Sequence, residues 1–162
     1  MELREGLLYG TTPQRAPRLR AKSDLHEALL DALRATGSPL RVASEGSVLL
    51  AEGEVPQPDL IVWEPRRTNG PVPGDSVRLA VEVSDTTLAD GLGRKRALYA
   101  AAAVPEYWVA NLRGRALHRF WTPADGACAR SAVVPFGEAI RSATLAGLAV
   151  PTDALDGGEA PG

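Results

Sequence analysis

Residues 77–108, VRLAVEVSDTTLADGLGRKRALYAAAAVPEYW, combine two kinds of hydrophobic pattern. Residues 77–83 are β-branched and apolar apart from two charged side chains, which is typical of a buried strand. A helix is predicted to begin at about Leu88 or Asp90. It ends before Pro105, because the residue that precedes a proline disfavours the helical region. The stretch therefore predicts a buried strand, a helix and the start of a further strand.

Other predicted elements flank this stretch on both sides. A helix is predicted from Lys22 to Thr36, with Ser23 as its N-cap, because apolar residues recur there at helical spacing. Strands are predicted over residues 40–51, 58–63, 107–110, 116–121 and 127–134. The order helix, strands, helix, strands indicates an α/β (α+β mixed) fold in which helices flank one mixed central sheet.

The length and composition are those of one globular domain. The chain has 162 residues, of which 44% are hydrophobic and 23% are charged. Residues 1–150 are expected to form this single domain. Residues 151–162, PTDALDGGEAPG, are expected to form a flexible acidic tail rich in glycine and proline.

Cysteine, histidine and apolar content exclude several classes of protein. Cys128, His26 and His118 are the only cysteine and histidine residues, too few for an internal disulfide or for a zinc site with four such ligands. The first ten residues lack the apolar segment of a secretory signal, and no apolar run approaches the ~20 residues that span a bilayer. We therefore expect a cytoplasmic protein without a membrane segment.

Charge gives a mixed indication about nucleic acid. The 18 basic and 20 acidic residues give a formal net charge of −2, so phosphate affinity would have to come from local clusters of basic side chains. The alternative is that such clusters are ordinary solvated surface. The clusters are Arg15, Arg18, Arg20 and Lys22; Arg66 and Arg67; Arg94, Lys95 and Arg96; and Arg113, Arg115 and Arg119.

Glu82 is the most informative charged residue. It lies among apolar residues in a predicted buried strand, where an ionised carboxylate is costly unless a cation or a partner compensates it. Asp59 opens the preceding strand, and Lys95 lies in the helix that follows Glu82. Two such carboxylates can bind Mg²⁺ through oxygen, and the lysine can stabilise charge on a phosphate.

A structural explanation of the same residues stays open at this point. In it Asp59 caps a turn, Glu82 pairs with Arg78 or Arg94, and Lys95 is a solvated helix residue. The spacing of Asp59 and Glu82 alone does not choose between the two explanations. His26 is expected to be a packing or surface residue in either case.

Five motifs of the chain, which include Asp59, Glu82 and Lys95, resemble those of the Uma-type restriction endonucleases, a branch of the PD-(D/E)XK nuclease superfamily. The start ELREG and the segment RSATLAGLAV extend the resemblance over nearly the whole chain. The motifs are the PD dipeptide Pro58-Asp59, the EV-x-S strand end from Glu82 to Ser84, the step from Asp90 to Lys95, Tyr99 four residues later, and VPEYW at 104–108.

The resemblance implies a restriction-endonuclease-like fold and roles for individual residues. Asp59 and Glu82 would bind the catalytic Mg²⁺, with Mn²⁺ as an alternative, helped by a main-chain carbonyl near Val83. Lys95 would be the catalytic lysine. In the commonest form of the superfamily that lysine lies two residues after the glutamate, where this chain has Ser84. Glu2 or Glu5 would contribute an extra carboxylate.

The function that follows is hydrolysis of phosphodiester bonds in DNA by metal-activated water. A homodimer would let so short a chain reach both strands of a duplex. Two alternatives stay open: a binding or regulatory protein that keeps the nuclease fold without turnover, and a nuclease that acts on RNA or on branched DNA.

Overall fold

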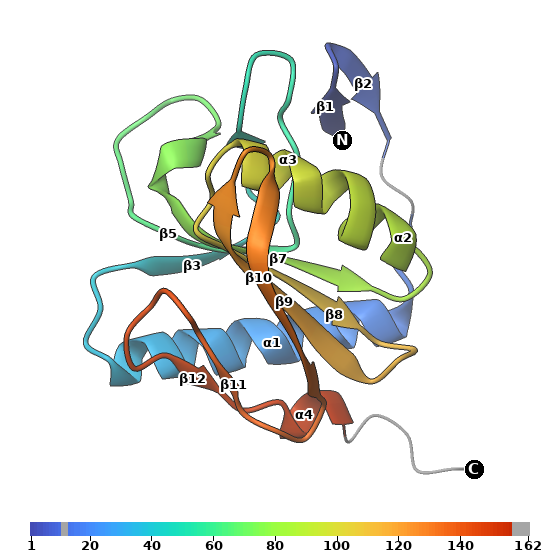
Figure 1. Ribbon diagram of the computed structural model, residues 1–162, viewed down its shortest axis with the longest axis vertical. Coiled ribbons are helices and arrows are strands. Elements are labelled where there is room, and N and C mark those ends of the chain that lie inside the picture. Colours follow the sequence, from blue (N-terminus) through green and yellow to red (C-terminus); the bar gives the residue numbers. More distant parts are fainter. Residues whose placement is uncertain (11–12, 157–162) are drawn as a thin grey trace.

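The computed structural model describes residues 1–10 and 13–156 and has a six-stranded sheet at its centre (Figure 1). The strand order is β10-β9-β8-β7-β5-β3. Only β7 and β8 run parallel, and the other neighbours in this sheet are antiparallel. The strands are β3 (Arg41–Ser44), β5 (Leu60–Trp63), β7 (Val77–Ser84), β8 (Glu106–Asn111), β9 (Ala116–Ala124) and β10 (Ala127–Pro135). The predicted mixed sheet with flanking helices is confirmed.

Helices cover both faces of this sheet. The helix α1 (Ala16–Ala35) packs on one face through Leu25, Leu29 and Leu33. The other face is covered by a helical segment made of α2 (Leu88–Asp90), a π-helical turn η2 (Gly91–Lys95) and α3 (Arg96–Ala101). Because side chains alternate along a strand, β7 contributes Val81 to the first core and Ala80 to the second.

The remaining short elements lie around the sheet. The hairpin of β1 and β2 is held beside the sheet by backbone hydrogen bonds in both directions between Leu3 and Val55, 3.2 and 3.0 Å long. These bonds bring the first residues of the chain next to the segment that enters β5. The short elements are β1 (Glu2–Arg4), β2 (Leu7–Tyr9), β4 (Val48–Leu49), β6 (Val72–Pro73), η1 (Gly74–Ser76), β11 (Ile140–Arg141), β12 (Ala149–Val150) and α4 (Asp153–Asp156).

The start of α1 corrects the sequence prediction. The helix begins at Ala16 and not at Lys22, and Ser23 lies inside it instead of capping it. Pro17 is in the first turn, where a proline is tolerated because the missing N–H would have no helical acceptor. This longer helix carries Arg18 along the sheet to the end of β7.

The first residues of the predicted tail pack against the domain in the structure. Residues 153–156 form α4, and Leu155 packs against the core. Thr152 is buried; its hydroxyl accepts from the Gly137 N–H at 2.8 Å and donates to the Glu138 carbonyl at 2.6 Å. The rest of the predicted tail, residues 157–162, lies outside the described residues. In the part of the chain that is described, no helix has the length and apolarity needed to cross a membrane.

Candidate functional site

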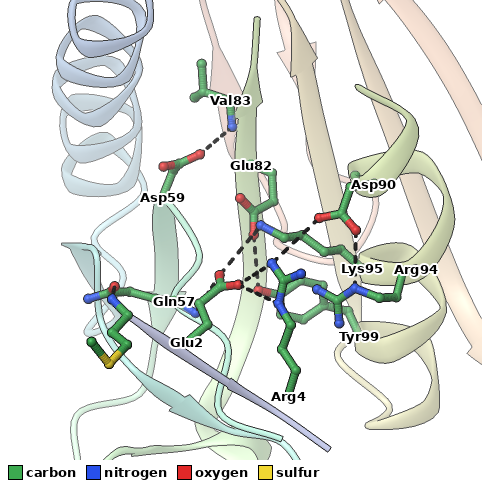
Figure 2. Close-up of polar contacts among 12 residues, drawn as sticks. Glu2, Arg4, Gln57, Asp59, Glu82, Val83, Asp90, Arg94, Lys95 and Tyr99 are labelled. Carbon is green, nitrogen blue, oxygen red and sulfur yellow. Dashed lines mark hydrogen bonds and ion pairs between the residues drawn. The ribbon is translucent and has the colours of Figure 1, made fainter. Parts of the chain in front are cut away.

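Asp59 and Glu82 are placed side by side by the antiparallel pairing of β5 and β7. Leu60 pairs with Val81, so Asp59 stands beside Glu82, one position beyond the paired stretch. Both carboxylates are buried, with 3% and 4% of their residue surface exposed. Figure 2 shows them beside β7, with Lys95 reaching Glu82 from the helical segment. The structure therefore brings the three predicted residues Asp59, Glu82 and Lys95 together.

Lys95 bridges two carboxylates. Its Nζ lies 3.2 Å from Glu82 Oε1 and 3.6 Å from Glu2 Oε1. The Tyr99 hydroxyl donates to the same oxygen of Glu82 at 3.4 Å. Burial raises the pKa of Glu82 to about 8, against the opposing effect of Lys95 and with a further upward effect of Asp59. Burial acts to lower the pKa of Lys95, but the charges of Glu82 and Glu2 outweigh it and raise that pKa.

The alternative ion pairs considered for Glu82 are not formed. Arg78 binds Glu64, with an N–O distance of 2.9 Å, and Arg94 binds Asp90, four residues earlier, at 3.2 Å. The side chain of Lys95 is only 13% exposed, so it is not a solvated helix residue. The structural explanation in which Glu82 pairs with either arginine is wrong.

Glu2 joins the site from the hairpin, while Glu5 does not. Glu2 is 4% exposed; its Oε2 accepts from Arg4 Nη2 at 2.7 Å and its Oε1 from the Gln57 N–H at 3.2 Å. Burial acts to raise the pKa of Glu2, but Lys95 and Arg4 outweigh this effect and hold it below the ordinary value. Glu5 is exposed, and its backbone N–H binds Glu54. The signal in the sequence was the ELREG start, which did not distinguish the two acids.

Arg18 is a site residue that the sequence did not single out. Its Nη2 donates to both carboxylate oxygens of Asp59, at 2.9 and 3.0 Å, and its Nε donates to the Val83 carbonyl at 2.9 Å. The Val83 N–H donates to Asp59 Oδ2 at 2.7 Å. Lys22, on the next turn of α1, forms an ion pair with Glu45, and its Nζ lies 3.7 Å from Asp59 Oδ1. Two members of the basic cluster at the start of α1, Arg18 and Lys22, therefore lie against Asp59.

The helical segment that carries Lys95 contains a π-turn. Gly91–Lys95 form this turn, a local irregularity that is frequent at functional sites. The Tyr107 hydroxyl donates to the Gly91 carbonyl at 2.9 Å. A β-carbon on Gly91 would lie 3.3 Å from the nearest Val109 methyl carbon, so a larger residue would require Val109 to shift by a few tenths of an ångström. Lys95, at the end of this turn, points toward Glu82 (Figure 2).

Ser84 occupies the position where the commonest form of the superfamily has its lysine. It lies two residues after Glu82 on the same face of β7 and is 3% exposed. Its hydroxyl oxygen has no hydrogen-bond partner among residues 1–10 and 13–156. His26, by comparison, is half-buried with its Nδ1 2.6 Å from Ser44 Oγ, as expected for a packing or surface residue.

Several of the site residues line a cavity of about 350 Å³. Its walls carry positively charged, negatively charged and neutral polar groups. They come from the hairpin, the start of α1, the loop before β5 and the segment that follows β7. A cavity with such walls suits a charged, hydrated ligand better than an apolar one. Its lining includes Glu2, Arg4, Arg18, Asp59, Asp85, Asp90 and Lys95.

The oxygen atoms at the site are of the kind that bind Mg²⁺. Carboxylates and backbone carbonyls are its preferred protein ligands, and Asp59, Glu82 and Val83 supply them. Positive groups already satisfy these oxygens, Arg18 at Asp59 and Val83, and Lys95 at Glu82. Within residues 1–10 and 13–156, no three Cys, His, Asp or Glu side chains form a ready-made metal cluster. The donors fit a hard cation, and the protein's own cations hold that position.

Comparisons with known proteins bear on the family and the fold. The model of the family Uma2, described as "Putative restriction endonuclease", matches residues 1–153. A crystal structure of a "putative nuclease belonging to DUF820" from Anabaena variabilis superposes with a TM-score of 0.69 at 12% sequence identity. The match covers 95% of this chain and 88% of that one. At this identity the likeness shows a shared fold. No curated protein matches the chain.

Proposed function

The chain belongs to the Uma2 family of restriction-endonuclease-like proteins, and we propose that it is an endonuclease that hydrolyses phosphodiester bonds in DNA with Mg²⁺ or Mn²⁺ as cofactor. One observation carries the proposal: two strands and a helical segment bring Asp59, Glu82 and Lys95 together at a single charged cavity, which Asp59 and Lys95 line while Glu82 lies against Lys95. A purely structural buried ion pair would not need a second buried carboxylate beside it.

The carboxylates are assigned to the cofactor. Asp59, Glu82 and the Val83 carbonyl would hold the cation. When bound, Mg²⁺ supplies positive charge for the scissile phosphate and lowers the pKa of a water molecule. The protein keeps the two carboxylates fixed through the β5–β7 pairing and through the Val83 N–H, which orients the Asp59 carboxylate.

Lys95 is assigned to the phosphate. Its ammonium group forms ion pairs with Glu82 and Glu2, carries three N–H donors and lines the cavity. There it would donate to a phosphate oxygen and stabilise the charge that develops during hydrolysis. Glu2 and Tyr99 act as positioning residues, because they hold Lys95 and Glu82 in place.

DNA is the substrate that we propose, and a homodimer is the form that we propose for cutting both strands. Arg4, Arg15 and Arg18 line the cavity with Lys95 and provide local positive charge for a phosphate backbone, which the overall charge of −2 does not. One observation favours a second candidate, a nuclease-fold protein that binds without turnover: Arg18 holds two of the three proposed ligands.

The proposed function is tested by two measurements on three proteins. Calorimetric titration with Mg²⁺ and nicking of a supercoiled plasmid are compared for the wild type, Asp59→Asn and Glu64→Gln. Glu64 is the control because its carboxylate forms an exposed ion pair with Arg78. We expect Asp59→Asn to lose both Mg²⁺ binding and nicking, and Glu64→Gln to keep both. A wild type that binds Mg²⁺ but leaves DNA intact would support the binding protein instead.

A further inference from the structure

We propose that Arg18 occupies the cation position in the metal-free protein and must release Asp59 and Val83 before a divalent cation binds there. The inference rests on the proposed function, because it takes these two residues as ligands. It assigns to Arg18 the role of a competitor that couples cation binding to substrate binding.

Both carboxylate oxygens of Asp59 already accept hydrogen bonds from protein groups. Arg18 donates to both carboxylate oxygens, and the Val83 N–H donates to Oδ2 as well. The same guanidinium donates through Nε to the Val83 carbonyl at 2.9 Å. Two bonds to a carboxylate and one to a carbonyl use the planar fork that distinguishes arginine from lysine. One side chain thus covers two of the three proposed cation ligands.

Because Asp59 is buried, its carboxylate needs the ion pair with Arg18 when no metal is bound. An ionised carboxylate that is 3% exposed needs a positive partner, and the second one nearby, Lys22, lies farther away at 3.7 Å. A divalent cation would supply the same compensation. Because Arg18 and the cation need the same oxygen atoms, the two exclude each other.

Arg18 has room to leave. Its side chain is 25% exposed and lies in the first turn of α1, on the wall of the cavity. A phosphate in this cavity would give the guanidinium a new bidentate partner. The arrival of the substrate backbone would then free Asp59 and Val83 for the cation. By linkage, the cation and the substrate each strengthen the binding of the other.

The test measures Mg²⁺ affinity without reference to activity. Calorimetric titrations compare the wild type with Arg18→Gln and Arg18→Lys, and Arg20→Gln is the matched control. Arg20 lies two residues later on the same helix and pairs with Asp24, with a side chain 63% exposed. We expect Arg18→Gln to bind Mg²⁺ more tightly on the order of tenfold, because one charge-assisted competitor is removed. Arg18→Lys should fall between it and the wild type, and Arg20→Gln should equal the wild type.

Two further comparisons keep the test decisive. The gain must disappear in Arg18→Gln combined with Asp59→Asn, which ties it to this site. If Arg18→Gln does not fold, Arg18→Lys carries the test, because it keeps the charge and loses the fork. Equal Mg²⁺ affinities in wild type and Arg18 variants would overturn the role of Arg18 and leave the metal site standing. Absence of Mg²⁺ binding in every protein would overturn both this inference and the proposed cofactor.

Discussion

The ammonium nitrogen of Lys95 lies 3.2 Å from Glu82 Oε1, although Glu82 belongs to strand β7 and Lys95 to the helical segment that packs on one face of the sheet. The lysine reaches the carboxylate from the end of a π-turn, and the strand position two residues after Glu82 holds Ser84. A lysine can therefore reach the Glu82 carboxylate either from β7 or from the helical segment, provided that the backbone that carries the lysine is held in place. Here the hydrogen bond from Tyr107 to Gly91 holds it.

Tyr107→Phe tests this support. The substitution removes the hydroxyl that binds the Gly91 carbonyl and leaves that buried acceptor without its partner. We expect a loss of about 1–2 kcal/mol in the free energy of unfolding, measured in urea, and slower plasmid nicking with unchanged Mg²⁺ affinity. Tyr9→Phe is the control, because Tyr9 is 45% exposed. Equal nicking rates in the two variants would show that the π-turn does not position Lys95.

Glu2→Gln tests the contribution of the hairpin. The variant removes one of the two carboxylates at Lys95 and one of the two carboxylates at Arg4, so Lys95 keeps Glu82 and Arg4 keeps Asp90. We expect about 1–2 kcal/mol of lost stability and reduced nicking, with Mg²⁺ affinity close to that of the wild type. Glu5→Gln changes an exposed acid in the same hairpin and should alter neither quantity. A Glu2 variant indistinguishable from the Glu5 variant would remove Glu2 from the site.

The pKa of Glu82 predicts a pH dependence of stability. Burial raises it to about 8 in the folded protein from an ordinary value of 4.5. The folded state therefore binds this proton more tightly than the unfolded state. The resulting stabilisation is fully present below pH 4.5 and is lost as the pH rises toward 8.

The measurement compares Glu82→Gln with the wild type in EDTA, by urea unfolding at several pH values. A glutamine does not titrate, so we expect the stability of the wild type relative to the variant to fall by a few kcal/mol between pH 4.5 and pH 8. Parallel pH profiles would mean that Glu82 keeps an ordinary pKa.

Local pattern and resemblance were sufficient to predict that Asp59, Glu82 and Lys95 lie together. The apolar run around Glu82 marks a buried strand, and the spacing to Lys95 matches a helix that follows it. Sheet register then brings the two carboxylates together, since Leu60 pairs with Val81. The strand and the helix themselves depend on residues close in sequence, which explains why they can be read from it, whereas the pairing of β5 with β7 is a property of the fold.

Arg18 and Glu2 depend on contacts that sequence patterns do not show. Arg18 was missed because the polar start of α1 gives a weak periodic signal, and the helix was predicted to begin after it. Glu2 reaches the site only because Leu3 pairs with Val55, some fifty residues later in the chain. Contacts over such separations follow from the assembled fold.

Cleavage by Lys95→Ala at saturating Mg²⁺ is the most direct test of the account. Arg78→Ala is the matched control, since Arg78 is a basic residue that pairs with Glu64 away from the cavity. We expect Lys95→Ala to nick supercoiled plasmid at least about a hundredfold more slowly than Arg78→Ala, while both proteins still bind Mg²⁺. Nicking by Lys95→Ala at the control rate would contradict the account.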